Sequence, residues 1–178
     1  DLGLITAGVR QLVKETGYPN MKVLQFAFDV DDEAGNNDYL PHNYNNNCVV
    51  YTGTHDNETL AGWFAGLSKE QKERVRTYLG DFDTANKWMY KKLVATAMGS
   101  AADMCVIPVQ DWLGLDNSSR MNTPGTVDIN WSWRLLPGQV TEELAEEVLA
   151  LTIKSNRANW ETLNQAKKAE EEGEEIAE

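Results

Sequence analysis

Three short, strongly apolar segments constrain the fold of this chain more than any other feature of its sequence. They cover residues 21–28 (MKVLQFAF), 48–52 (CVVYT) and 104–109 (MCVIPV), with little alternation between apolar and polar residues. This pattern is typical of parallel strands buried on both faces, because helices cover both sides of such a sheet. Helical patterns separate the three segments, so we expect an α/β fold with a parallel sheet.

The predicted helices begin at residues that can cap a first turn. These residues are Thr6, Ser68, Asp83 or Thr84, and Thr141. Ser68 with Gln71 has the spacing of a capping box, and Gly17 can end the first helix. The helix after Thr141 has apolar residues at the spacing of a face that packs on a core.

Polar side chains follow each predicted strand. Asp29 follows the first strand, His55 and Asp56 follow the second, and Gln110 and Asp111 follow the third. Because the carboxyl ends of parallel strands meet at one edge of a sheet, we expect these side chains to share one face of the molecule.

The charge of the chain argues against two classes of partner. A formal net charge of -12 and the lack of a basic stripe argue against nucleic acid, and an acidic surface repels anionic membranes. No apolar run reaches the length of a membrane span, and residues 1–3 do not resemble a signal peptide. We expect a cytoplasmic protein, and a neutral polysaccharide is compatible with this charge.

Neither a metal nor an organic cofactor is expected. The two histidines, His42 and His55, do not form an H-E-x-x-H pattern. Cys48 and Cys105 both lie in apolar runs, which favours reduced, buried thiols that pack as small hydrophobic side chains.

Carboxylates at strand ends beside an imidazole suit sugar chemistry. Glycosyl transfer passes through an oxocarbenium-like state, and a fixed carboxylate can stabilise its positive charge. Asp56 is the candidate for this role. The alternative is that Asp56 only caps the helix that begins near Glu58, and that His55 is a hydrogen-bonded structural residue.

Five segments in order resemble the 4-α-glucanotransferases of the amylomaltase (disproportionating enzyme) type. They are MKVLQFAFD, LPHNY, CVVYTGTHDNET, ADMCVIPVQDWLGL and RMNTPGTVDINWSWRL. The resemblance covers about residues 1–165, with 166–178 left as an acidic helix end or disordered tail. It implies that the three strands are about the sixth to eighth of a TIM-type (β/α)8 barrel, because three strands cannot close one.

The resemblance also implies roles for individual residues. Asp56 matches the carboxylate that stabilises the transition state, His55 a sugar-binding histidine and Asn122 a substrate-contacting asparagine. Phe26 and Asp29 match acceptor-side contacts. The nucleophile has no counterpart here, and residues 1–3 resemble the end of the family's E-D-L-G element, whose Glu is the acid/base.

The resemblance therefore implies transfer of α-1,4-glucan segments between maltodextrins with retention, by an enzyme of which this chain is a fragment. Its expected partners are a maltodextrin or starch-type glucan and the missing N-terminal part of the same enzyme. A noncatalytic glucan-binding module and an α-amylase-like hydrolase remain as alternatives.

The remaining aromatic residues have structural interpretations beside functional ones. We expect Trp63 and Trp88 to pack in the core, because they lie on apolar helix faces. Trp131 and Trp133 stay open, since either can line a cleft beside RMNTPGT. His42 is interpreted as a residue that orders its loop.

Overall fold

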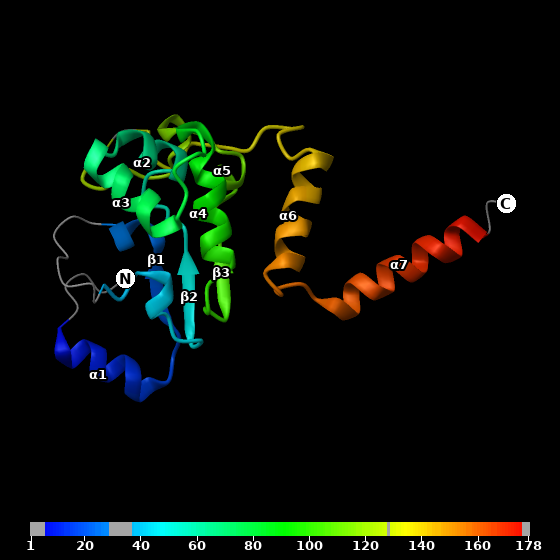
Figure 1. The fold of residues 1–178 in the computed structure, drawn as a ribbon, viewed down its shortest axis with the longest axis horizontal. Helices are drawn as coiled ribbons and strands as arrows, with labels where there is room; N and C mark the ends of the chain where they lie inside the picture. The colour runs from blue at the N-terminus through cyan, green and yellow to red at the C-terminus, as the bar shows by residue number, and fades with distance from the viewer. Residues whose placement is uncertain (1–5, 29–36, 128, 176–178) are drawn as a thin grey trace. The chain divides into compact units, whose positions relative to one another are not determined.

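The structure is a computed structural model that describes residues 6–28, 37–127 and 129–175. It divides into two compact units, Asp1–Val140 and Thr141–Glu178. The first unit holds the sheet and the candidate site, and the second consists of two helices (Figure 1).

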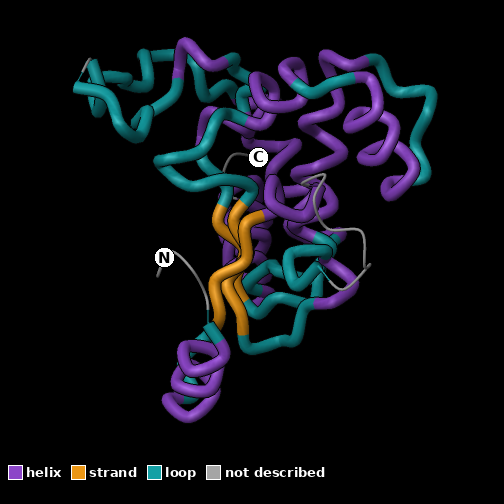
Figure 2. The backbone as a smooth tube through the Cα atoms, turned by 90° about the vertical axis from the view of Figure 1, so that its left-hand side faces the viewer, coloured by secondary structure: helices purple, strands orange, loops and turns teal. Residues whose placement is uncertain are grey.

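The first unit is built on a three-stranded parallel sheet, as the sequence predicts. Its strands are β1 (Asn20–Val23), β2 (Cys48–Tyr51) and β3 (Met104–Val106), in the order β1-β2-β3. Both strand pairs are parallel, and Figure 2 shows the three strands side by side. The carboxyl ends of all three strands therefore lie at the same edge of the sheet.

Two of the predicted strands are shorter than their apolar segments. After β1 the chain enters a 3-10 helix, η1 (Leu24–Phe28), whose side chains are buried apart from Phe26. After β3, Pro108 precedes the short helix α5 (Val109–Trp112). Apolar composition reports burial and does not distinguish a strand from a buried helical turn, so the predicted strand ends at residues 28 and 109 were wrong.

The sheet is not fully buried on both faces. In the central strand β2, Cys48 and Val50 on one face are fully buried, and Val49 and Tyr51 on the other face are half-buried. In β3, by contrast, Met104 and Val106 are exposed. The prediction of a doubly buried strand is therefore wrong for β3, which lies at an edge of the sheet.

The helices of the first unit are α1 (Ala7–Thr16), α2 (Leu60–Gly66), α3 (Lys69–Leu79) and α4 (Met89–Met98), with short 3-10 turns η2 (Pro41–Asn43), η3 (Asn86–Trp88) and η4 (Asn117–Ser119). Thr6 caps α1, and Ser68 with Gln71 forms the predicted capping box of α3. The predicted start of α4 at Asp83 or Thr84 was wrong, because Asp81 accepts hydrogen bonds from the Thr84 backbone and hydroxyl and holds that segment as a loop.

The core of the first unit lies between α2, α4, η1 and β2. Its fully buried side chains include Leu24, Phe28, Val50, Leu60, Phe64, Met89 and Leu93. Figure 1 shows α2 and α3 beyond the end of the sheet to which the arrow of β2 points. The loop that leaves β2 leads into α2.

Two aromatic predictions had different outcomes. Trp63, predicted to pack in the core, contacts the rings of Phe28 and Phe64 but is only half-buried, so it lies at the margin of the core. Trp88, predicted to pack in the core, is exposed because it lies in η3, at the amino-terminal end of α4 and off its buried face. His42 stacks on Tyr78 of α3, with ring centroids 5.7 Å apart, which supports its interpretation as a loop-ordering residue.

The second unit contains α6 (Glu142–Lys154) and α7 (Trp160–Glu175). Thr141 caps α6 as predicted, accepting a hydrogen bond from the Leu144 backbone. No described residue of this unit is buried, and the expected packing of the α6 apolar face on a core stays a prediction. The boundary at residue 165 stays a prediction.

Two further expectations concern the thiols and membranes. Cys48 is buried and Cys105 half-buried, and no disulfide joins them. Among the described residues, no helix is long and apolar enough to cross a membrane.

Candidate functional site

The loop that leaves β2 forms a tight polar turn over residues 54–57. The Asn57 side-chain oxygen accepts hydrogen bonds from the Thr54 backbone N–H and hydroxyl, each at 2.9 Å. The Asp56 backbone N–H in turn donates to the Thr54 hydroxyl oxygen at 3.2 Å. Gly53 precedes this turn, and a Cβ there would lie 2.7 Å from the Gln25 amide nitrogen and 3.1 Å from Asn57 Cβ, so a side chain at this position would displace its neighbours. The turn fixes the backbone from which His55 and Asp56 project.

Asp56 does not cap a helix. The N-cap of α2 is Thr59, whose hydroxyl oxygen accepts a hydrogen bond from the Gly62 backbone at 3.2 Å. This assignment removes the structural alternative for Asp56, because another side chain already satisfies the first turn of α2. The Asp56 carboxylate is thus available for other contacts.

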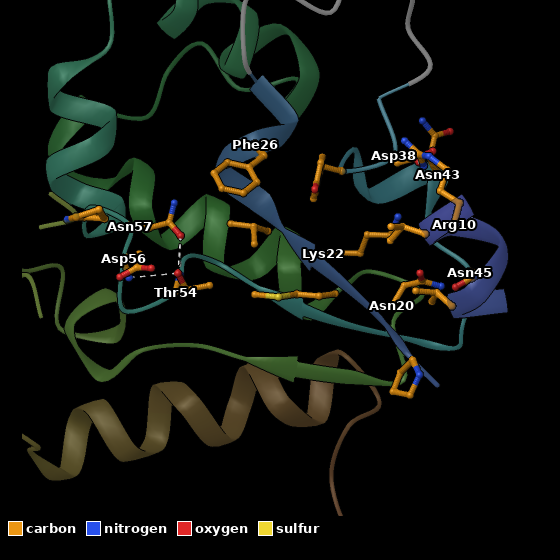
Figure 3. Close-up of a pocket in the computed structure, with 17 residues that line it drawn as sticks. Arg10, Asn20, Lys22, Phe26, Asp38, Asn43, Asn45, Thr54, Asp56 and Asn57 are labelled. Carbon is orange, nitrogen blue, oxygen red and sulfur yellow. Dashed lines mark hydrogen bonds and ion pairs between the residues drawn. The ribbon is translucent and has the colours of Figure 1, made fainter. Parts of the chain in front are cut away.

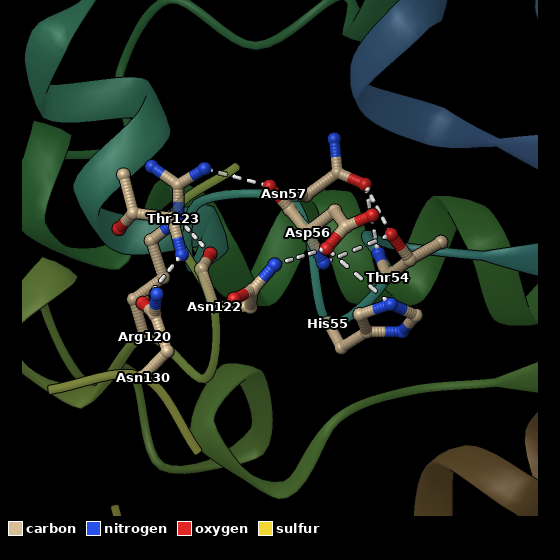
Figure 4. Close-up of polar contacts among 8 residues, drawn as sticks. All are labelled: Thr54, His55, Asp56, Asn57, Arg120, Asn122, Thr123 and Asn130. Atoms are coloured by element: carbon tan, nitrogen blue, oxygen red, sulfur yellow. Dashed lines mark hydrogen bonds and ion pairs between the residues drawn. The ribbon is translucent and has the colours of Figure 1, made fainter. Parts of the chain in front are cut away.

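A second loop, which follows α5 and η4, closes over this turn (Figure 4). Asn122 donates from its side-chain amide to Asp56 Oδ1 at 2.7 Å, and its backbone N–H donates to the His55 carbonyl at 3.1 Å. Arg120 donates to the Asp56 carbonyl at 2.6 Å and to the Asn122 carbonyl at 2.8 Å. Arg120 therefore ties the two loops together and fixes Asn122 against Asp56.

His55 completes the cluster around the carboxylate. Its Nε2 lies 3.3 Å from Asp56 Oδ1, and the two side chains are 55% and 41% exposed. Both side chains are exposed enough to contact a ligand, and hydrogen bonds from Asn122 to Asp56 Oδ1 and to the His55 carbonyl fix their orientation. The His55 ring also lies beside the Trp131 ring, with centroids 5.0 Å apart.

Gln110 and Asp111 do not join this cluster, although the sequence placed them at the end of a strand. Both are buried in α5. Asp111 accepts hydrogen bonds from the Thr52 hydroxyl at 2.6 Å and from the Leu60 backbone at 2.7 Å. Burial raises the pKa of this carboxyl, and the two hydrogen bonds oppose that rise. Asp111 thus joins the end of β2 to the start of α2 and has a structural role.

A groove of about 850 Å³ runs from Asp56 along β1 (Figure 3). Phe26, Thr54, Asp56 and Asn57 gather at one end of it, and Lys22 lies toward the other. Phe26, predicted as a substrate contact, is exposed toward this groove and meets the Tyr39 ring edge-on. Asp29, also predicted as a contact, lies outside the described residues.

Within the described residues, this cluster is a polar candidate ligand site. Those residues contain no group of three or more His, Cys, Asp or Glu side chains that could hold a metal ion. A carboxylate, an imidazole and an amide converge at the carboxyl end of a parallel strand, next to an aromatic ring. The fold and this cluster define an α/β protein with a candidate ligand site beyond the carboxyl ends of its strands.

Comparison with known proteins narrows this class to one family. A family model described as 4-alpha-glucanotransferase matches residues 1–141. A 4-alpha-glucanotransferase of Synechocystis is 43% identical over 91% of this chain, and a chloroplastic/amyloplastic one of Solanum tuberosum is 48% identical over 76% of it. The chain belongs to the 4-alpha-glucanotransferase family, as the sequence resemblance predicted.

A solved structure agrees with this assignment. Amylomaltase from Streptococcus agalactiae, in complex with acarbose, superimposes with a TM-score of 0.82 and 34% sequence identity over 89% of this chain. This chain spans 31% of that protein, and 31% and 23% of the Synechocystis and potato relatives. The chain therefore corresponds to about a third or less of the length of these relatives.

Sequence reasoning identified Asp56, His55 and Asn122, and the structure brings these three together. It missed Arg120, which was visible only as the first letter of RMNTPGT. It also missed Thr54 and Asn57, whose three-residue spacing is typical of side-chain hydrogen bonds within a turn. That spacing was the one local signal that could have revealed them.

Proposed function

We propose that this chain provides the transition-state-stabilising part of an active site that transfers α-1,4-glucan segments between maltodextrins with retention of configuration. The proposal is carried by the Asp56 carboxylate, which is half-exposed at the groove and held by the Asn122 amide at 2.7 Å. A carboxylate fixed in advance stabilises positive charge on an anomeric carbon without having to reorganise. Membership of the 4-alpha-glucanotransferase family supports this reaction class.

The neighbours of Asp56 have proposed roles in binding the sugar. His55 and Asn122 both contact Oδ1 of Asp56, so we assign them to orienting the carboxylate and donating to hydroxyl groups of the same glucose unit. Phe26 lines the groove, in which we place the acceptor glucan. Asp29 is proposed as a further contact of the acceptor. No cofactor enters this scheme.

The remaining catalytic groups are proposed to come from a polypeptide that corresponds to the N-terminal part of the relatives. In this scheme β1, β2 and β3 are the sixth to eighth strands of a (β/α)8 barrel, and the nucleophile and acid/base stand on earlier strands. The exposed edge strand β3 and the groove along β1 support this arrangement. The expected cytoplasmic location stays a prediction.

To test this proposal, this chain is mixed with a second polypeptide that corresponds to the part of the relatives not covered by this chain. Maltotriose is then added to the mixture. We expect longer and shorter maltodextrins from the mixture and none from this chain alone. Asp56→Asn should reduce the rate of transfer at least about 100-fold, the scale of removing a preorganised electrostatic group. The matched control is Asp83→Asn, at an exposed carboxylate on the η3 side of the unit, and it should leave the rate unchanged.

Vigorous disproportionation by the chain alone would contradict the proposal, because the nucleophile would then lie within it. Full activity of the Asp56→Asn mixture would contradict the role of Asp56. Glucan binding without any transfer by the mixture would favour the noncatalytic module instead.

A further inference from the structure

Trp131 holds an unusual backbone conformation beside the candidate site. Its φ is 62°, in the left-handed region that bulky residues rarely adopt. Its ring nevertheless lies next to the His55 ring, with centroids 5.0 Å apart and planes at 37°. An outlier of this kind next to a candidate site is a reason to look for a function.

The surrounding loop imposes this conformation. The Trp131 N–H donates to the Met121 carbonyl at 2.6 Å, and its own carbonyl accepts from Arg134 at 2.8 Å. The preceding Asn130 accepts from the Thr123 backbone at 2.9 Å, and its amide donates back to Thr126. The indole is thus presented by a network that runs into the same loop as Asn122.

The Trp131 side chain also stays accessible. The residue is 52% exposed, although its ring already contacts His55. Indole rings present a flat apolar face with a polar edge, which suits the C–H face of a sugar ring whose hydroxyl groups bond to nearby polar groups.

We propose that Trp131 is a glucan-contacting residue, on which one glucose unit of an α-glucan stacks beside the unit bound by His55 and Asp56. This inference rests on the proposed function, because it takes an α-glucan as the ligand. It adds an aromatic contact to a cluster that is otherwise polar. Trp131 is then a binding residue and takes no part in bond making or breaking.

Calorimetric titration of the full chain with maltoheptaose tests this assignment. We expect Trp131→Ala to weaken binding roughly five- to tenfold, the scale of one stacking contact, and Trp131→Phe to change it less than about twofold. Trp88→Ala is the matched control. Trp88 is 48% exposed, and Lys87 and Lys91 lie over its ring, so its removal should leave the affinity unchanged.

The outcomes separate this inference from the proposed function. If the wild-type chain binds and Trp131→Ala binds equally well, the stacking role is wrong while the proposed function stands. If Trp131→Ala shifts the His55 ring signals in NMR spectra but leaves the affinity for maltoheptaose unchanged, Trp131 only positions His55, and the stacking role is again wrong. If the wild-type chain binds maltoheptaose neither alone nor in the mixture with the completing polypeptide, the proposed function fails and this inference fails with it. If Trp131→Ala does not fold, NMR of the wild-type chain replaces it. The Trp131 indole N–H signal is identified as the one that is missing from Trp131→Phe. We expect this signal to shift when maltoheptaose is added, and an unchanged signal would overturn the assignment.

Discussion

Two aspartates of this chain show how the surroundings of a residue decide its role. Asp56 is 41% exposed, and its carboxylate meets an amide and an imidazole at the groove. Asp111 is buried and holds the hydroxyl of Thr52 and the backbone N–H of Leu60. Burial raises the pKa of Asp111 because it disfavours the charged form, and its two hydrogen-bond donors offset part of that cost.

Thr52→Val tests the structural role of Asp111. Valine keeps the shape of threonine but removes the hydroxyl donor, so the buried carboxylate loses one of its two partners. We expect the free energy of unfolding, measured by urea denaturation, to fall by about 1–3 kcal/mol. Thr96→Val, which removes a hydroxyl bonded to the Lys92 carbonyl within α4, should change it by less than about 0.5 kcal/mol.

The pH dependence of this variant follows from the raised pKa of Asp111. A carboxyl whose pKa is higher in the folded state contributes stability at low pH, and that contribution is lost as the pH rises through the folded pKa. Thr52→Val removes a hydrogen bond that lowers the pKa of Asp111, so ionising this carboxyl in the folded protein becomes less favourable. The deficit should therefore be larger at neutral pH than below pH ~4, near the ordinary pKa of Asp. An equal deficit at both pH values would contradict this account.

At the scale of secondary structure, local signals located helix starts better than strand ends. Thr6, Ser68 and Thr141 cap their helices as predicted, because a cap depends on a few neighbouring residues. The apolar runs at 21–28 and 104–109 break into a strand followed by a helical turn. Whether a buried backbone pairs in a sheet or turns depends on which neighbours are present, and that information is not local.

Packing between α4 and the end of α5 gives a prediction at the same scale. Gly114 has a φ of 63°, and a Cβ there would lie 2.4 Å from the ring of Tyr90, a buried residue of α4. Gly80, after α3, has the same φ but nothing within 4 Å of its Cβ position. Gly80→Ala should lower the free energy of unfolding by about 1–2 kcal/mol through backbone strain alone. Gly114→Ala should lower it by roughly a further 1–3 kcal/mol, because the ring must move.

Thermal or urea unfolding of the two variants measures this difference, and far-ultraviolet circular dichroism checks that each has folded. Equal losses for Gly80→Ala and Gly114→Ala would mean that the contact between α5 and α4 is not as tight as the structure shows.

For the first unit as a whole, the exposed sheet edges determine whether the isolated chain associates. β1 and β3 lie at the two edges, and Met104 and Val106 of β3 are exposed. An exposed apolar edge strand is a surface on which further strands pair, either from a completing polypeptide or from another copy of the chain.

We therefore expect the isolated chain to associate as its concentration rises, measured by size-exclusion chromatography with light scattering. Met104→Lys should weaken this association at least about tenfold, because a charged side chain on an edge opposes strand pairing. Phe82→Lys changes a similarly exposed apolar residue outside the sheet and should have no such effect. A chain that stays monomeric at every concentration would contradict the prediction.

The sequence by itself determined the parallel α/β arrangement, most of the helix caps, and the family with its THDN and RMN motifs. These features depend on residues that are neighbours in the chain or on ordered motifs, so they can be read without coordinates. Only the tertiary structure decided which polar groups meet. Arg120 and Asn122 reach Asp56 across 64 and 66 residues, Asp111 is withdrawn into the core, and Trp131 is turned against His55. Such contacts arise when distant segments pack together, because burial and hydrogen bonding then select among side chains that local propensity treats alike.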